Sequence, residues 1–271
     1  MNYSIQSKSL HFFIKFVAMT KVSIIGSGNV AQHLIQAFQL DNAIELVQVV
    51  ARHKKSLEHL LDSHKIISDY RQLSDADLYI IAVSDDAIVE VSSQLPFENK
   101  FVVHTSGTVT LDAINNNNRK GVFYPLQTFS IDKQLNFKTI PICLEAENET
   151  DLQTLNQIAN TISDTVYTIN SEQRKALHLA AVFVNNFVNH LYQIGNEICD
   201  TNQLPFDILK PLIQETANKI VTLSPKEAQT GPAKRNDHKT IEAHEQFITD
   251  ENQATIYKLL TQSIQNNGKK L

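Results

Sequence analysis

Between residues 21 and 170 the hydrophobic residues come in short apolar runs that are separated by polar, turn-forming segments. Such runs, rich in β-branched residues, are typical of strands buried in a parallel sheet. Several of them are linked by segments with helical spacing, which predicts an α/β fold with a doubly wound parallel sheet. The expected strands are Val22–Ile25, Leu46–Val50, Asp77–Val83, Phe101–Val103, Gly121–Tyr124, Ile140–Glu145 and Val166–Ile169.

From Asn170 onward the pattern becomes helical and strand-like runs disappear. Asn170 together with Gln173, or Ser171 alone, can cap a long helix that runs to about Cys199. Further helical spacing follows at Pro205–Leu223, Thr240–Phe247 and Glu251–Ile264. The pattern therefore predicts two domains, an α/β domain over 21–170 and an all-helical domain over 171–271.

A glycine-rich turn follows the first expected strand, and Asn29–Leu40 then takes up helical spacing. Strand, G-x-G-x-x-A and helix in this order form the dinucleotide-binding pattern of a Rossmann domain. The first glycine permits the tight turn, the second lets a pyrophosphate approach the main chain, and the alanine lets the helix lie close to the strand. The expected cofactor-binding residues here are Gly26, Ser27, Gly28, Asn29, Val30 and Ala31. The alternative is a glycine turn that holds no ligand.

The residues after the second strand indicate which nicotinamide coenzyme is bound. An acidic residue at this position accepts hydrogen bonds from the ribose of NAD, whereas a cation accommodates the extra phosphate of NADP. The chain has Arg52-His53-Lys54-Lys55-Ser56 and no acid. We therefore predict NADP, with Arg52 as the main phosphate contact and Ser56 or His53 assisting. The alternative is a solvated charged loop.

Two further turns follow strands at the same expected edge of the sheet, where ligands of open α/β folds bind. Val83 and Ser84 are candidates for cofactor contact, and Ser84 or Asp85 could instead only cap the next helix. His104 follows the next strand and is a candidate proton donor if it faces the cleft. Ser106 is expected to act as a helix cap.

The long helix carries polar residues within an otherwise apolar stretch. On an α-helix, Lys175, His178, Asn185 and Asn189 fall along one stripe. Because buried amides and imidazoles need hydrogen-bond partners, this stripe predicts either a substrate site or a polar network between helices or across a dimer interface. We take His178 as the candidate proton donor and Asn185 as the candidate substrate-orienting residue.

A second candidate segment is the loop around Gly231-Pro232, where Thr230, Arg235 and Asp237 could fold over the cleft. Arg235 could hold a substrate carboxylate through two parallel hydrogen bonds. The alternative is a turn between helices, with Arg235 and Asp237 as a surface ion pair.

Composition narrows the range of functions. The net charge is −5 and no basic block dominates, so nothing favours nucleic acid or a membrane surface. The histidines and the two cysteines, Cys143 and Cys199, have no metal-ligand spacing, and the cysteines are expected to be reduced in a cytoplasmic protein. Since Met19 precedes the first strand closely, we expect residues 1–20 to be a non-native or disordered extension rather than a signal peptide.

Residues Lys21–Leu271 resemble a family of bacterial Rossmann-like proteins that carry a helical C-terminal domain of uncharacterised function and are labelled NADP oxidoreductases. The matching stretches are GSGNVA, VFYPLQTFS, SEQRKALHLAAVFVNNF and AQTGPAKRND. More remotely the chain is similar to pyrroline-5-carboxylate reductase, to deazaflavin-dependent NADP reductases and to β-hydroxyacid dehydrogenases. These relatives imply a helical domain of the dehydrogenase type that dimerises and forms the substrate pocket against the nucleotide domain.

The β-hydroxyacid dehydrogenases carry a catalytic lysine and, one helical turn later, an asparagine. Here Leu179 stands one turn after Lys175, so this chain departs from their catalytic pattern, and His178 and Asn185 occupy the stripe instead. We expect an NADP-dependent oxidoreductase that moves hydride between nicotinamide and a small carbonyl or imine substrate, and that forms a homodimer. The alternative is an NADP-binding sensor or scaffold without turnover.

Overall fold

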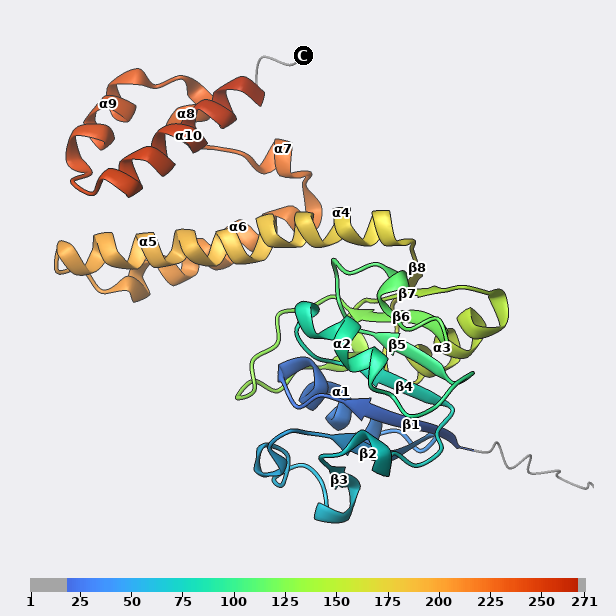
Figure 1. The fold of residues 1–271 in the computed structure, drawn as a ribbon. Helices are drawn as coiled ribbons and strands as arrows, with labels where there is room; N and C mark the ends of the chain where they lie inside the picture. Colours follow the sequence, from blue (N-terminus) through green and yellow to red (C-terminus); the bar gives the residue numbers. More distant parts are fainter. Residues whose placement is uncertain (1–18, 268–271) are drawn as a thin grey trace, which may run out of the picture. The chain divides into compact units, whose positions relative to one another are not determined.

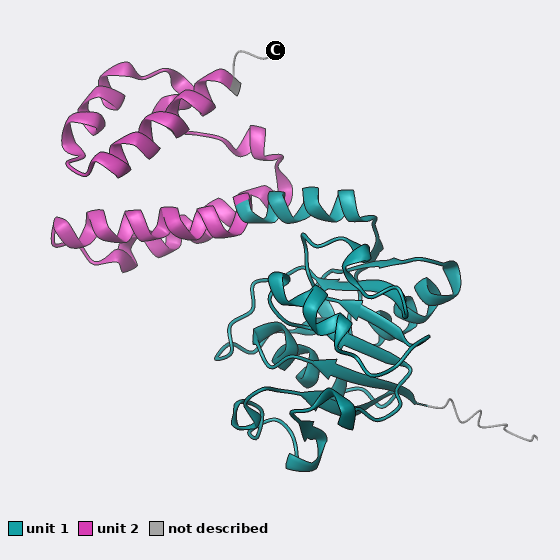
Figure 2. Cartoon of the chain, viewed as in Figure 1, with its two compact units in different colours: residues 1–182 teal, residues 183–271 magenta. Residues whose placement is uncertain are grey.

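The computed structural model describes residues 19–267, and the chain falls into two compact units, Met1–Val182 and Phe183–Leu271 (Figure 2). We call them the sheet unit and the helical unit and describe each by itself. The expected N-terminal extension falls almost entirely in residues 1–18, which lie outside the described residues.

Within residues 19–267, eight strands form one sheet with the order β3-β2-β1-β4-β5-β6-β7-β8 (Figure 1). Neighbouring strands are parallel except β6 and β7, so the predicted doubly wound α/β fold is confirmed. The strands are β1 (Thr20–Ile25), β2 (Ile44–Val50), β3 (Ile66–Ile67), β4 (Leu78–Ile81), β5 (Phe101–His104), β6 (Arg119–Pro125), β7 (Ile142–Ala146) and β8 (Val166–Thr168).

The sheet differs from the sequence prediction in two places. The segment 126–141 between β6 and β7 holds a 3-10 turn, Phe137–Thr139, and no α-helix. Because a parallel connection needs a crossover of a dozen or more residues that is usually helical, β7 instead returns antiparallel to β6. The second difference is β3, whose two residues are too short to give a recognisable pattern.

Both faces of the sheet are covered, which explains why its strands are apolar throughout. Helices α1 (Asn29–Gln39) and α3 (Glu149–Ile162) pack on one face, where they share a core with β1, β2 and β4 to β7. On the other face, α2 (Ile88–Ser93) packs against alternate residues of the same central strands, such as Ile25 and Ile81.

The first helix of the predicted helical domain belongs to the sheet unit. It is α4 (Ser171–Ala181), and it begins with the predicted capping box, in which Asn170 and Gln173 exchange side-chain and backbone hydrogen bonds. Leu177 of this helix packs against β6 and β7. These contacts explain why the boundary between the two compact units falls after Val182. The sequence pattern, by contrast, changes near residue 170.

A π-helical segment, Val182–Phe187, follows α4 directly and leads into the helical unit. This unit contains a 3-10 turn, Phe206–Leu209, and α5 (Val188–Thr201), α6 (Lys210–Thr222), α7 (Pro225–Ala228), α8 (Pro232–Arg235), α9 (His238–Phe247) and α10 (Glu251–Asn267). Among its described residues, the buried hydrophobic side chains are those of Cys199, Ala233 and Ile241. No helix among the described residues is both long enough and apolar enough to cross a membrane.

Candidate functional site

A cleft of about 720 Å³ opens at the carboxyl ends of the central strands of the sheet unit. It lies where the strand order reverses, because β1 continues to β2 on one side and pairs with β4 on the other. Open α/β sheets bind ligands at such a switch point. Eight predicted cofactor residues line it: Gly26, Ser27, Gly28, Asn29, Val30, Arg52, Val83 and Ser84.

The glycine turn has the geometry that a dinucleotide requires. Gly26 has φ +134°, and a Cβ there would stand 2.0 Å from the carbonyl oxygen of Ala82. A Cβ on Gly28 would meet no atom within 4 Å, so this side of the backbone is open. Helix α1 begins at Asn29 without a side-chain cap, which leaves its first amides available to an anion. The turn therefore fits a diphosphate.

Ala31 takes the structural role predicted for it. It is fully buried in the core beneath the turn and does not line the cleft. Its small side chain lets α1 lie close to the sheet.

The end of the cleft beyond β2 carries the cation that was predicted to select NADP. Arg52 lines the cleft together with Ser68 and Tyr70, which the sequence reading missed. Burial raises the pKa of Tyr70, and the nearby Arg52 cation acts in the opposite direction. Ser56 does not line the cleft, because its hydroxyl donates to the carbonyl of His53 in a 3-10 turn. Ser56 is therefore not placed to assist Arg52.

The polar residues after β4 and β5 do not cap helices as expected. Ser84 makes no side-chain capping bond, and the Asp85 carboxylate instead accepts a hydrogen bond from the Thr108 hydroxyl. The Ser106 hydroxyl accepts hydrogen bonds from the amides of Thr108 and Val109, which closes a tight turn in the loop after β5. The capping predictions are wrong, because Ser106 satisfies the loop backbone, Asp85 binds the Thr108 hydroxyl, and no α-helix begins beside Ser106.

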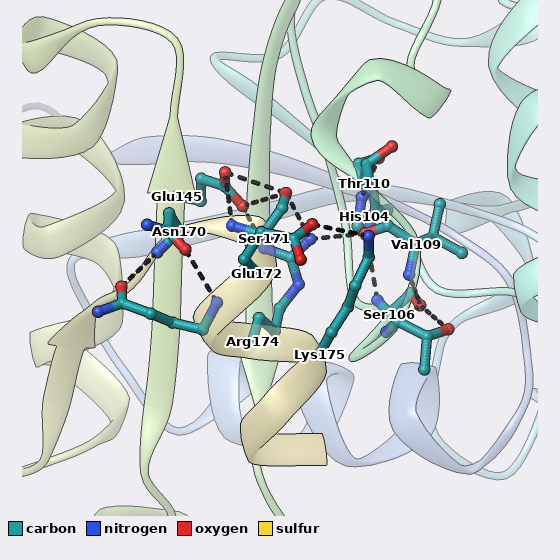
Figure 3. Close-up of polar contacts among 12 residues, drawn as sticks. His104, Ser106, Val109, Thr110, Glu145, Asn170, Ser171, Glu172, Arg174 and Lys175 are labelled. Atoms are coloured by element: carbon teal, nitrogen blue, oxygen red, sulfur yellow. Dashed lines mark hydrogen bonds and ion pairs between the residues drawn. The ribbon is translucent and has the colours of Figure 1, made fainter. Parts of the chain in front are cut away.

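His104 is buried and both nitrogens of its ring are engaged (Figure 3). Nδ1 accepts a hydrogen bond from the Ser106 amide at 3.2 Å, so Nε2 carries the proton and donates to the Thr110 carbonyl at 3.2 Å. Burial, and then the Arg174 cation, lower the pKa of His104 to about 4. The neutral ring thus stabilises the loop that follows β5 through its two hydrogen bonds and does not face the cleft.

His178 projects from α4 and meets Tyr124, near the carboxyl end of β6. The phenol oxygen lies 3.1 Å from Nδ1 of His178, and the two rings are tilted by 59°. His178 is partly exposed, whereas Tyr124 is buried. Because Gly107 packs against this pair and follows the cleft residue Thr105 closely, the predicted proton donor lies beside the end of the cleft.

A buried arginine fixes the start of α4 to the sheet (Figure 3). Arg174 is 1% exposed, forms an ion pair with Glu145 of β7 and donates to the carbonyl of Val109. Glu145 also accepts hydrogen bonds from the amide and hydroxyl of Ser171. These bonds join β7, the loop after β5 and α4, and so determine where His178 lies. The sequence did not mark Arg174, since a lone arginine in a helix is normally exposed.

Lys175 is not paired with a site residue. Its ammonium group forms an ion pair with Glu172 at 2.9 Å, and its side chain is 42% exposed.

The remaining predicted site residues lie in the helical unit, where Asn185 and Arg235 are both exposed. Asn185 stands in the π-helical segment, and π-turns often mark functional sites. The i to i+5 bonding of this segment interrupts α-helical spacing, so the single stripe predicted from Lys175 to Asn189 does not continue through it.

The predicted Gly-Pro loop contains a short helix. Arg235 ends α8, and Asp237 caps α9 by accepting a hydrogen bond from the Thr240 amide at 3.2 Å. The prediction of an open loop was wrong, because Pro at the first helical position favours a helix start. Among residues 19–267, no group of three or more His, Cys, Asp or Glu side chains could hold a metal ion.

Comparison with known families assigns both parts of the chain. Residues 21–107 match the family described as "NADP oxidoreductase coenzyme F420-dependent", and residues 140–264 match "Domain of unknown function (DUF2520)". No curated protein matches the sequence.

Solved structures extend this assignment to the whole chain. A pyrroline carboxylate reductase from Plasmodium falciparum with NADP bound is 14% identical, with a TM-score of 0.59 over 91% of this chain and 98% of that one. An imine reductase from Pseudomonas sp. is 15% identical, with a TM-score of 0.66 over 92% and 95%. These two share the fold.

A third structure is much more similar. The "putative NADP oxidoreductase" from Bacteroides fragilis is 38% identical, with a TM-score of 0.83 over 92% of this chain and 98% of that one. The chain therefore belongs to the family of this Bacteroides fragilis protein, with an N-terminal NADP oxidoreductase Rossmann domain and a C-terminal DUF2520 domain.

Proposed function

We propose that the protein is an NADP-dependent oxidoreductase that transfers hydride between nicotinamide and a small carbonyl or imine substrate. The observation that carries this proposal is the continuity of the cleft with a protonatable side chain. The cleft runs from the glycine turn to Thr105, and His178 packs on Gly107 immediately beyond. Coenzyme and proton donor would thus meet at one edge of the sheet.

Different residues of the cleft are proposed to bind different parts of the coenzyme. The open backbone at Gly28 and the uncapped amides of α1 suit the diphosphate, and the Arg52 guanidinium suits a ribose phosphate. When bound, the reduced nicotinamide supplies the hydride, and the protein must supply orientation and a proton.

The roles of the other predicted residues follow from their surroundings. His178 is partly exposed and is the proposed proton donor, whereas His104 uses both ring nitrogens within its loop. Asn185 and Arg235 are proposed to orient the substrate and bind a substrate anion, and their exposed polar groups support this. The names of the imine reductase and of a reductive aminase that shares the fold are the ground for including imines.

Binding and turnover test the proposal separately. Calorimetric titration with NADPH is expected to show saturable binding, and no response to NADPH or NADH would contradict it. NADPH oxidation is then followed against a panel of keto acids, imines and deazaflavins. Turnover that is lost in His178→Gln, but kept in the exposed control His59→Gln, is the expected result. Binding without turnover across the panel would favour the sensor function.

The preference for NADP rests on Arg52. Replacing it by alanine is expected to weaken NADPH binding about 10- to 100-fold, or roughly 1.4–2.7 kcal/mol, and to leave NADH binding unchanged. The neighbouring Lys55→Ala, which changes a cation that does not line the cleft, is the matched control. An unchanged preference for NADPH in Arg52→Ala would remove this residue from the site.

We also propose that the helical unit pairs with a second copy of the chain. Its described residues bury few hydrophobic side chains, while Val184, Leu212 and Val221 are 63–81% exposed. Exposed apolar patches of this extent mark interaction sites, and homodimers are the commonest solution. Light scattering at micromolar concentration is expected to give twice the mass of one chain, and a monomer would contradict the proposal.

A further inference from the structure

The His178–Tyr124 pair is built by three segments that lie far apart in the sequence. The histidine comes from α4, the tyrosine from β6, and the floor beneath both rings is Gly107 in the loop after β5. A Cβ on Gly107 would stand 2.6 Å from Nδ1 of His178 and 2.9 Å from Cζ of Tyr124. The absence of a side chain at this position is therefore what lets the two rings meet.

We propose that Tyr124 is a positioning residue, which holds Nδ1 of His178 so that Nε2 is the atom that gives a proton to the substrate. This inference rests on the proposed function and names the residue that orients its proton donor. No other side chain among the described residues forms a hydrogen bond with His178. Among the described residues, Nε2 of His178 forms no hydrogen bond with the protein.

The direction of the hydrogen bond follows from the chemistry. A histidine that gives up its Nε2 proton becomes neutral and must keep the proton on Nδ1. That Nδ1–H then needs an acceptor, and the Tyr124 oxygen is in place at 3.1 Å. Hydride from the reduced coenzyme would add to the substrate carbon, the electron pair of the double bond would move to the oxygen or nitrogen, and that atom would take the Nε2 proton.

Burial of the phenol supports this direction. It raises the pKa of Tyr124 to about 12, so that the hydroxyl stays neutral near neutral pH. A neutral phenol oxygen accepts a hydrogen bond without removing the proton from the imidazole. Besides burial, Cys143 and Asp85 raise the pKa of Tyr124 and the Arg174 cation lowers it, and none of the three forms a hydrogen bond with its hydroxyl.

The test reads the tautomer of His178 directly. Nitrogen chemical shifts of ¹⁵N-histidine protein report which ring nitrogen carries the proton, and His178 is assigned from the signals that disappear in His178→Gln. Neutral His178 is expected to carry its proton on Nδ1 in the native protein. In Tyr124→Phe, which keeps the ring but removes the acceptor, the proton is expected to redistribute toward Nε2.

Two further variants keep this test interpretable. Gly107→Ala leaves the hydroxyl in place but pushes the rings apart, and it is expected to shift the tautomer in the same direction. Tyr167→Phe changes a tyrosine that is 53% exposed and is expected to leave His178 unchanged. A native proton on Nε2, or the same tautomer in Tyr124→Phe as in the native protein, would overturn the proposal.

Kinetics separate this inference from the proposed function. In Tyr124→Phe, kcat for any substrate found is expected to fall about 10-fold or more, within the range that general acid catalysis contributes, while KM for NADPH stays within about twofold. If the KM for NADPH instead rises by the same factor by which kcat falls, the positioning role is overturned. Lack of NADPH binding by the native protein would reject the proposed function, and the tautomer measurement would still decide whether Tyr124 holds His178.

Discussion

The two units of this protein use their large apolar residues differently. In the sheet unit the apolar residues fill two cores, one on each face of the sheet, and leave few large hydrophobic side chains exposed. In the helical unit most large hydrophobic side chains remain exposed. The sheet unit thus completes its own core, whereas the helical unit leaves most of its large apolar side chains on the surface.

The candidate site residues are also distributed unequally between the two units. The sheet unit contains the cleft, the glycine turn and the His178–Tyr124 pair, all of which depend on a rigid scaffold. Four matched pairs of substitutions, one member in each unit, test how far this contrast extends.

The largest expected effect comes from a pair of phenylalanines. Phe123 is fully buried in β6, and Phe247 of α9 is 64% exposed. Phe123→Ala is expected to lower the free energy of unfolding by about 3–5 kcal/mol, because it leaves a cavity. Phe247→Ala is expected to change it by less than about 0.5 kcal/mol in dilute solution. Urea unfolding measures both, and equal costs would contradict the contrast.

A pair of arginines is expected to show the next largest effect. Arg174→Met leaves the Glu145 carboxylate without its buried partner, at a cost of roughly 3 kcal/mol. The exposed Arg235→Met is expected to cost less than about 0.5 kcal/mol. Replacing Glu145 by Gln in the Arg174→Met background should recover part of the loss. No recovery would show that the two side chains do not act as a pair.

A pair of histidines tests the electrostatics of the sheet unit. The pKa of His104 lies at about 4, below its ordinary value of 6.5, so folding disfavours its protonation. Stability from this group is present above about pH 6.5 and is lost as the pH falls toward 4, by an amount on the order of 3 kcal/mol. Unfolding between about pH 7 and pH 4.5 should therefore depend less on pH in His104→Asn. Replacing the exposed His190 by Asn is expected to leave the pH dependence of unfolding unchanged. The same change in both variants would contradict the assignment of this pH dependence to His104.

The smallest effect is expected from a pair of exposed valines. Val221 of α6 is 81% exposed and Val89 of α2 is 60% exposed. If a second copy covers the helical unit, Val221→Asp should weaken the dimer at least about tenfold, or about 1.4 kcal/mol, while Val89→Asp leaves it unchanged. Sedimentation velocity over a dilution series measures this. Dissociation by Val89→Asp alone would place the interface on the sheet unit instead.

The local features of this protein could be predicted from its sequence. The glycine turn, the capping box at Asn170 and most of the buried strands are each encoded within about ten consecutive residues, by backbone freedom, hydrogen-bond capping and periodicity. The sequence also identified Arg52 and His178 as candidates, because a cation after the second strand and an imidazole in an apolar helix are unusual where they stand. Predicted roles failed where a side chain had an alternative partner nearby, as Asp85 has in Thr108.

Other features were decided by contacts between distant segments. Tyr124 and His178 are separated by 54 positions, and Arg174 and Val109 by 65, so no local pattern reveals that they meet. The antiparallel return of β7 and the burial of Arg174 likewise depend on what packs around them. The sequence alone specified most of the elements and showed that the glycine turn suits a dinucleotide. Only the tertiary structure determined which side chains share a site, because hydrogen bonding and burial act through space rather than along the chain.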